Sequence, residues 1–95
     1  MKNHPISVRL VDGKHVCTPT ESEVKPGDTV FWDGKEPMLV FFSHGSPFVE
    51  GNGPFSNGQQ VTVGKKPPLH GGEVFVPTIA LDSKVRPTVG GIKVT

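Results

Sequence analysis

Glycine and proline interrupt this chain so often that no stretch remains in which an amphipathic helix is expected. Gly and Pro supply 12 and 10 of the 95 residues, and they break every window long enough to carry a helical stripe of apolar side chains. Between them lie short runs in which apolar and polar residues alternate, as they do in half-buried strands. This distribution of Gly and Pro between short alternating runs predicts an all-β protein.

The alternation is clearest in residues 6–11, where Ile6, Val8 and Leu10 share one face. Asp12-Gly13 follows as a hairpin turn, because both residue types tolerate positive φ. The apolar run 38–42 is typical of a strand covered on both faces or lining the core between two sheets. Residues 20–25, 43–58 and 82–89 are predicted to be loops or edges. With further strands in 14–18, 29–32, 59–63, 73–76, 79–81 and 91–94, the pattern predicts one Greek-key β-sandwich domain, residues 1–95, of about seven or eight short strands.

Charge and composition exclude several classes of partner. The net charge of +1 leaves no basic stripe that could collect phosphates, so no nucleic-acid partner is expected. The apolar run 38–42 is far too short to span a membrane, so no membrane insertion is expected. The N-terminus lacks the apolar segment of a signal peptide. We therefore expect a cytoplasmic protein as encoded, or a periplasmic or secreted one if a leader has been removed.

A turn and strand near the middle of the chain resemble a known family. The motif Val24-x-Pro26-Gly27-Asp28-x-Val30-x-Trp32 resembles the cupredoxins (plastocyanin- and azurin-type β-sandwiches), where a Pro-Gly turn precedes a strand with an aromatic residue. The last strand, Gly90-x-Ile92-x-Val94, and the segment 73–76 are similar to the final two strands of that family. The resemblance implies a cupredoxin-like Greek-key sandwich over most of residues 24–95.

The resemblance does not extend to the copper ligands of the family. Its copper-binding members use two His, one Cys and a weak axial Met. Met38 stands where the first histidine is expected, and Pro77 stands where the cysteine is expected. No Cys, His or Met lies between Pro77 and Gly90. We therefore expect a cupredoxin-like domain without a type 1 copper centre and without a cofactor.

Copper binding outside the type 1 arrangement remains an alternative. The chain has four histidines, spaced eleven or more positions apart, and the better pair is His44 and His70, with Met38 as a third ligand. The competing interpretation is that the histidines face solvent or cap strands. In a chain that began at Lys2, the segment Lys2-Asn3-His4 would chelate Cu²⁺ or Ni²⁺ through its free amine, but a retained Met1 removes that site.

Catalysis has little support in the sequence. The chain has one cysteine, Cys17, which would need a base and an electropositive setting to act as a nucleophile. His15 is the only neighbour that offers either. His15 and Cys17 share one face of a strand, and the simpler interpretation is a partly exposed histidine beside a small buried thiol. We therefore do not predict an enzyme, and a small enzyme that uses Cys17 is the weakest alternative.

The leading hypothesis is a non-enzymatic binding or interaction module. The expected contact surface consists of loops 43–58 and 64–72, and the partner is an unidentified protein or small molecule. Self-association through an exposed strand or apolar patch is a further expectation. Phe48 and Phe55 in the first loop are expected to fold over the sheet, since burying apolar surface stabilises by about 25 cal/mol per Å².

Overall fold

The computed structural model describes residues 2–64 and 74–95, and this part of the chain is all-β with no helix. It contains ten strands, more than the seven or eight expected, because several short pairings lie within segments predicted to be loops. The strands are β1 (Asn3–Val11), β2 (Lys14–Val24), β3 (Thr29–Gly34), β4 (Met38–Phe41), β5 (Phe55–Ser56), β6 (Val61–Thr62), β7 (Val74–Phe75), β8 (Thr78–Leu81), β9 (Lys84–Arg86) and β10 (Thr88–Val94). Within this part of the chain, no helix is long and apolar enough to cross a membrane.

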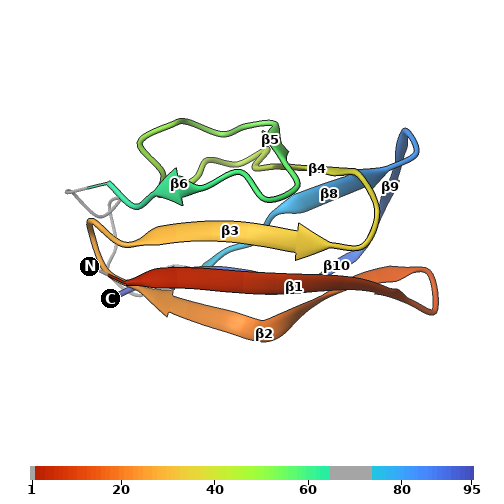
Figure 1. Ribbon diagram of the computed structural model, residues 1–95, viewed down its shortest axis with the longest axis horizontal. Coiled ribbons are helices and arrows are strands. Elements are labelled where there is room, and N and C mark those ends of the chain that lie inside the picture. The colour runs from red at the N-terminus through yellow and green to blue at the C-terminus, as the bar shows by residue number, and fades with distance from the viewer. Residues whose placement is uncertain (1, 65–73) are drawn as a thin grey trace.

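The strands form two sheets (Figure 1). The larger sheet has the order β6-β3-β1-β2-β10-β7, and the smaller has the order β5-β4-β8-β9. The large sheet is mixed, because β1 pairs parallel with β3 and β10 pairs parallel with β2. Both chain termini lie at one end of the molecule, and the β1–β2 and β8–β9 hairpins lie at the other. We call the latter the hairpin end.

Two tight turns shape the hairpin end. Asp12 and Gly13 have φ of 49° and 75° and connect Val11 to Lys14, which confirms the predicted turn. Asp82 and Ser83 have φ of 52° and 61° and connect β8 to β9 in the same way. The prediction of an irregular segment over residues 82–89 is wrong beyond this turn, because 84–86 form β9 and β10 begins at Thr88. Asp tolerates the left-handed conformation well enough to form this turn.

Of the loop or edge predicted over residues 20–25, the loop is wrong, because β2 continues to Val24. Glu21 to Val24 pair in parallel with Gly91 to Val94. Ser22 and Val24 are buried, so the period-two pattern is present although polar residues surround it. A bulge precedes this pairing, and there Gly90 (φ +153°) lies so close to Cys17 that an added Cβ would be 2.5 Å from the Cys17 Cβ.

The core lies between the sheets and is built from alternate residues of the strands. Met38 and Val40 of β4 face inward while Leu39 is 46% exposed, so β4 lines the core on one face only. Trp32 is the centre of an aromatic group with Phe42, Phe48 and Phe55, whose ring centroids lie 5.8–6.3 Å from that of Trp32. Phe48 and Phe55 are buried, which confirms that segment 43–58 closes over the core.

Asp28 fixes the Pro26-Gly27 turn to the N-terminal strand. Its carboxylate accepts hydrogen bonds from the backbone N–H of Lys2 (3.0 Å) and of Lys25 (3.1 Å), and it pairs with His4 Nε2 at 2.8 Å. The hydrogen bonds from Lys2, His4 and Lys25 favour the ionised carboxylate and hold the pKa of Asp28 well below its usual range. We call this arrangement the Asp28 clamp.

Candidate functional site

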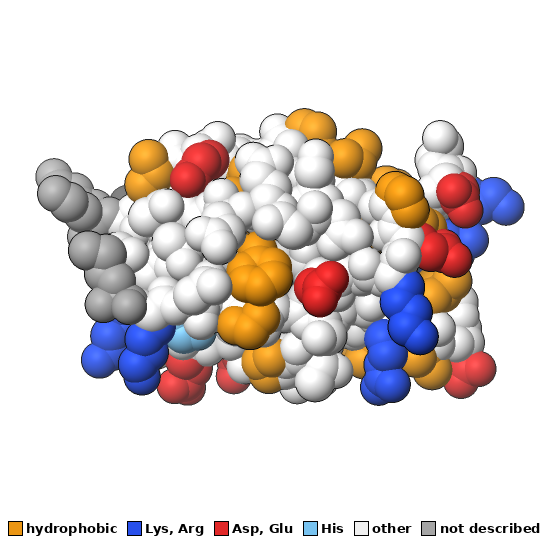
Figure 2. Space-filling view, viewed as in Figure 1, with side chains coloured by type: hydrophobic (Ala, Val, Ile, Leu, Met, Phe, Trp, Pro, Cys, Tyr) orange, Lys and Arg blue, Asp and Glu red, His pale blue; other side chains and the backbone are white. Residues whose placement is uncertain are grey.

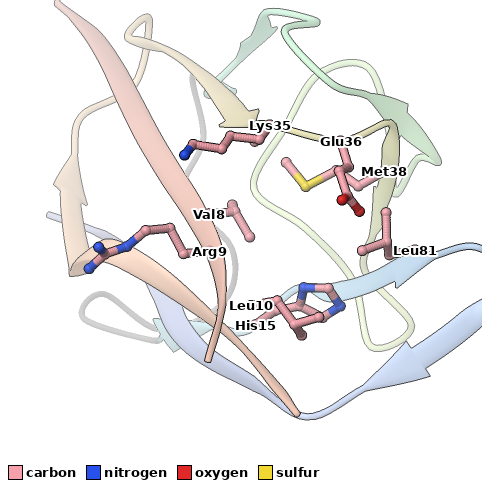
Figure 3. Close-up of a pocket in the computed structure, with 9 residues that line it drawn as sticks. Val8, Arg9, Leu10, His15, Lys35, Glu36, Met38 and Leu81 are labelled. Carbon is pink, nitrogen blue, oxygen red and sulfur yellow. The ribbon is translucent and has the colours of Figure 1, made fainter. Parts of the chain in front are cut away.

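A pocket of about 290 Å³ opens at the hairpin end. Figure 3 shows side chains from β1, β2, β4 and β8 arranged around it, together with the turn between β3 and β4. The volume is at the small end of the range for ligand sites in proteins. The pocket is lined by Val8, Arg9, Leu10, His15, Gly34, Lys35, Glu36, Met38 and Leu81.

The pocket walls are mostly apolar because strand alternation turns apolar residues inward at this end. Val8 and Leu10 occupy alternate positions on β1, so their side chains point to the same face. Met38 and Leu81 are directly paired across β4 and β8. Val8, Met38 and Leu81 are buried, whereas Leu10 is 46% exposed. Leu10 therefore lies nearest the opening, and the other three form the deeper wall.

His15 is the one polar side chain of the pocket that belongs to the protein interior. It is only 2% exposed, and its backbone N–H donates to the Pro87 carbonyl at 2.8 Å. Its Nε2 atom has no hydrogen-bond partner among residues 2–64 and 74–95. Burial lowers the pKa of His15, and the nearby positive charge of Arg86 lowers it further. His15 is therefore a neutral imidazole at pH 7 with an unused ring nitrogen.

Two more unpaired polar groups accompany His15. Thr88 lies opposite His15 in the β2–β10 register, and Arg86 lies opposite buried Ile79 in the β8–β9 register. Residues directly opposite one another project to the same face of a sheet, so both side chains face inward. Arg86 Nη1 and Thr88 Oγ1 are buried and lack a partner within the described residues. Because buried polar atoms are nearly always paired, this polar cluster of His15, Arg86 and Thr88 is unusual.

The rim of the pocket carries charge of both signs. Arg9, Lys35 and Glu36 are exposed and line the opening. Elsewhere, Figure 2 shows Lys and Arg side chains toward both ends of the visible face, with neither sign forming a continuous stripe across it. Lys35 and Glu36 therefore give the rim one charge of each sign, while the Arg9 side chain points away from the pocket (Figure 3).

The metal ligands suggested by the sequence are not brought together as far as the structure describes them. Met38 begins β4 and lines the pocket, whereas His44 is exposed in the turn beyond the other end of β4. At about 3.4 Å per strand residue, roughly 10 Å separates Met38 from the other end of that strand. His70 lies outside the described residues, as does most of loop 64–72. Among the described residues, no group of three or more His, Cys, Asp or Glu side chains could hold a metal ion.

The structure also shows where the other residues singled out in the sequence lie. Pro77 precedes β8, whereas the residue paired with Met38 is Leu81, at the opposite end of that strand. Cys17 is 2% exposed, and burial raises the pKa of its thiol to about 11. This thiol is therefore protonated at neutral pH and shielded from substrates, as expected of a buried structural cysteine. His4 is occupied by the Asp28 clamp.

The pocket was not predicted from the sequence, because the expectation of a partly exposed His15 is wrong: His15 is buried. Pro87, just before β10, accepts a hydrogen bond from the His15 backbone N–H, and Thr88, the first residue of β10, pairs with His15. Parallel pairing between strands distant in the sequence leaves no local signal. The available signal was that His15 shares a face with Cys17, a residue type that is usually buried. Arg86 and Thr88 had been placed in an irregular segment and were not considered.

Comparison with known proteins assigns neither a family nor a function to this chain. No family model matches the sequence, and no curated protein matches it either. The function is therefore inferred from the pocket and its polar cluster.

Proposed function

We propose that this chain is a non-enzymatic, cupredoxin-like binding module without a type 1 copper centre, and that it binds a small molecule in the pocket at the hairpin end. The two-sheet, helix-free arrangement and the strand carrying Trp32 after the Pro-Gly turn support the cupredoxin-like interpretation. The one cysteine of the sequence, Cys17, is buried, and burial raises the pKa of its thiol to about 11. This supports a domain without type 1 copper, since that centre requires a thiolate.

The observation that carries the proposal is the combination of apolar walls with an unpaired, buried His15 in one pocket. Ligand sites are mostly apolar and contain a few fixed polar groups that orient the ligand. His15 is held by strand pairing on both sides, to Leu10 and to Thr88. It is thus pre-positioned on a rigid element, which lowers the entropic cost of binding.

Binding fits the pocket better than catalysis does. None of the lining residues carries a hydroxyl or a thiol, so His15 has no nucleophile to activate within the lining. The segment 43–58 is a weaker candidate contact surface than the sequence suggested, because its Phe48 and Phe55 side chains are used in the core.

The proposal is tested by NMR with ¹⁵N-labelled protein and a panel of small neutral, acidic and basic amphiphiles. We expect at least one class to cause saturable shifts in the amide signals of Val8, Leu10, Gly34 and Met38, with little change at the Asp28 clamp. The absence of saturable shifts at these amides with every class, at millimolar concentrations, would contradict a binding function for the pocket.

A further inference from the structure

We propose that the ligand of the pocket is a small amphiphilic anion, with a carboxylate-type head at the polar cluster and a short aliphatic tail against Val8, Met38 and Leu81. This inference rests on the proposed binding function and goes further by naming the chemistry of the ligand. Its basis is the unpaired Nε2 of His15 in the pocket wall, beside which lie two more unpaired polar atoms: Thr88 Oγ1, opposite His15 in the strand register, and Arg86 Nη1, whose positive charge acts on His15.

The size and lining of the pocket determine the length and the chemistry of the ligand tail that it can hold. A volume of about 290 Å³ equals that of roughly ten water molecules in the liquid. This is enough for a short-chain carboxylate such as hexanoate and too little for a long-chain lipid. The deeper wall offers only aliphatic and thioether groups, which bind an alkyl chain through burial of apolar surface and provide no partner for polar groups along it.

The polar cluster determines the sign of the charge on the ligand's head group. Arg86 is permanently charged and can only donate hydrogen bonds, and its Nη1 is buried without a partner among the described residues. Thr88 can donate through its hydroxyl, and neutral His15 can donate from Nε2 in one tautomer. A carboxylate is an acceptor-only group with lone pairs for several donors, so it complements this cluster.

The charge behind the pocket wall supports an anionic head group. At the rim, Lys35 and Glu36 carry opposite charges, and the Arg9 side chain points away from the pocket (Figure 3). A cationic head group at His15 would be repelled by the positive charge of Arg86, which acts on His15. A neutral head group would leave the charge of Arg86 unpaired. Hydrogen bonds to charged groups are the stronger ones, so an anion gains most from this arrangement.

The test compares three probes of equal chain length, hexanoate, hexanol and hexylammonium, by NMR titration of the wild-type protein. We expect hexanoate to bind about tenfold more tightly than either of the others, as the loss of charged hydrogen bonds implies. It should also shift the ring ¹H and ¹³C signals of His15. Binding of hexanol or hexylammonium as tight as that of hexanoate would overturn the anion inference and leave the pocket as a binding site. Failure of all three to cause saturable shifts would overturn the inference and count against the proposed function as well.

A matched pair of variants tests the role of Arg86. Arg86→Met removes the charge and keeps an aliphatic stem, whereas Lys84→Met removes an exposed charge from the same strand. We expect Arg86→Met to weaken hexanoate binding about tenfold and to leave hexanol binding unchanged, while Lys84→Met changes neither. Because Arg86 carries an unpaired buried atom, the Met variant should fold at least as stably as the wild type. Unchanged hexanoate affinity in a folded Arg86→Met variant would contradict the proposal.

Discussion

At the scale of single residues, Asp28 decides how firmly the N-terminal strand is held. One carboxylate joins the backbone of Lys2, the side chain of His4 and the turn at Lys25. It thus ties the start of β1 to the turn before β3, and these two strands pair in parallel along six positions. The first residues of most domains are poorly ordered unless such contacts hold them. We therefore infer that the clamp keeps β1 in register at its free end.

The clamp predicts a specific dependence of stability on pH. A carboxyl group whose pKa is lowered by folding stabilises the folded state above its unfolded pKa, near 4, and this contribution is lost as pH falls through the folded pKa. Asp28→Asn should therefore lower the melting temperature at pH 7, and the difference from wild type should shrink below about pH 4. Thermal unfolding followed by circular dichroism between pH 7 and pH 2 measures both effects.

Asp33→Asn provides the control for this experiment, because Asp33 is exposed on β3 and outside the clamp. It should leave the melting temperature nearly unchanged at every pH. A difference between Asp28→Asn and wild type that is constant from pH 7 to pH 2 would contradict the role given to the clamp.

The sequence predicts the environment of some single residues and not of others. The turn at Pro26-Gly27 and the core position of Trp32 could be predicted, because local residue types determine them. His15 could not, since its burial depends on Pro87 and Thr88, more than seventy positions away in the chain. The sequence shows that a strand passes through His15 but does not show which strand pairs beside it.

At the scale of elements, the segment 43–58 stabilises the fold although only two of its residues, Phe55 and Ser56, form a strand. It contributes Phe48 and Phe55 to the aromatic group around Trp32. Its backbone is bound to β6 by the hydrogen bond from Val49 N–H to the Thr62 carbonyl (2.9 Å), and to Val63, directly after β6, by the bridge with Phe48. The segment is therefore a structural part of the core wall.

This role predicts unequal effects for two neighbouring substitutions. Phe48→Ala removes a buried ring that contacts Trp32 and should lower the free energy of unfolding by about 3 kcal/mol or more. Val49→Ala changes a side chain that is 70% exposed and should alter it by no more than about 0.5 kcal/mol. Urea denaturation of both variants measures the difference. Equal destabilisation by the two substitutions would show that Phe48 does not anchor the segment.

Strand boundaries show why elements were only partly predictable. β1 and β4 were recognised because their apolar residues alternate or cluster visibly. The second half of β2 was missed because Glu21 and Glu23 face outward and only Ser22 and Val24 face inward. β9 was missed because a three-residue edge strand whose side chains are exposed or only half-buried has no apolar pattern. In both cases a neighbouring strand supplies the structure that composition alone does not indicate.

At the scale of the whole molecule, the two ends of the two-sheet fold carry different features. At the end with the termini, the Asp28 clamp joins the start of β1 to the turn before β3. At the hairpin end, β1 and β2 extend past the turn between β3 and β4, and the interior opens into the pocket (Figure 1). The all-β class and the single core could be predicted from the alternation, but the open end depends on strand lengths that only the assembled sheets define.

The most direct test of the binding function compares Leu10→Trp with Val11→Trp in a hexanoate titration followed by NMR. Leu10 is half-exposed at the pocket opening, so the larger side chain can fill the pocket without displacing the core, whereas the adjacent Val11 projects to the opposite face. We expect Leu10→Trp to weaken hexanoate binding by at least about tenfold, or roughly 1.4 kcal/mol. We expect Val11→Trp to bind hexanoate as the wild type does. Wild-type affinity in a folded Leu10→Trp variant would show that the ligand binds elsewhere and would contradict the account.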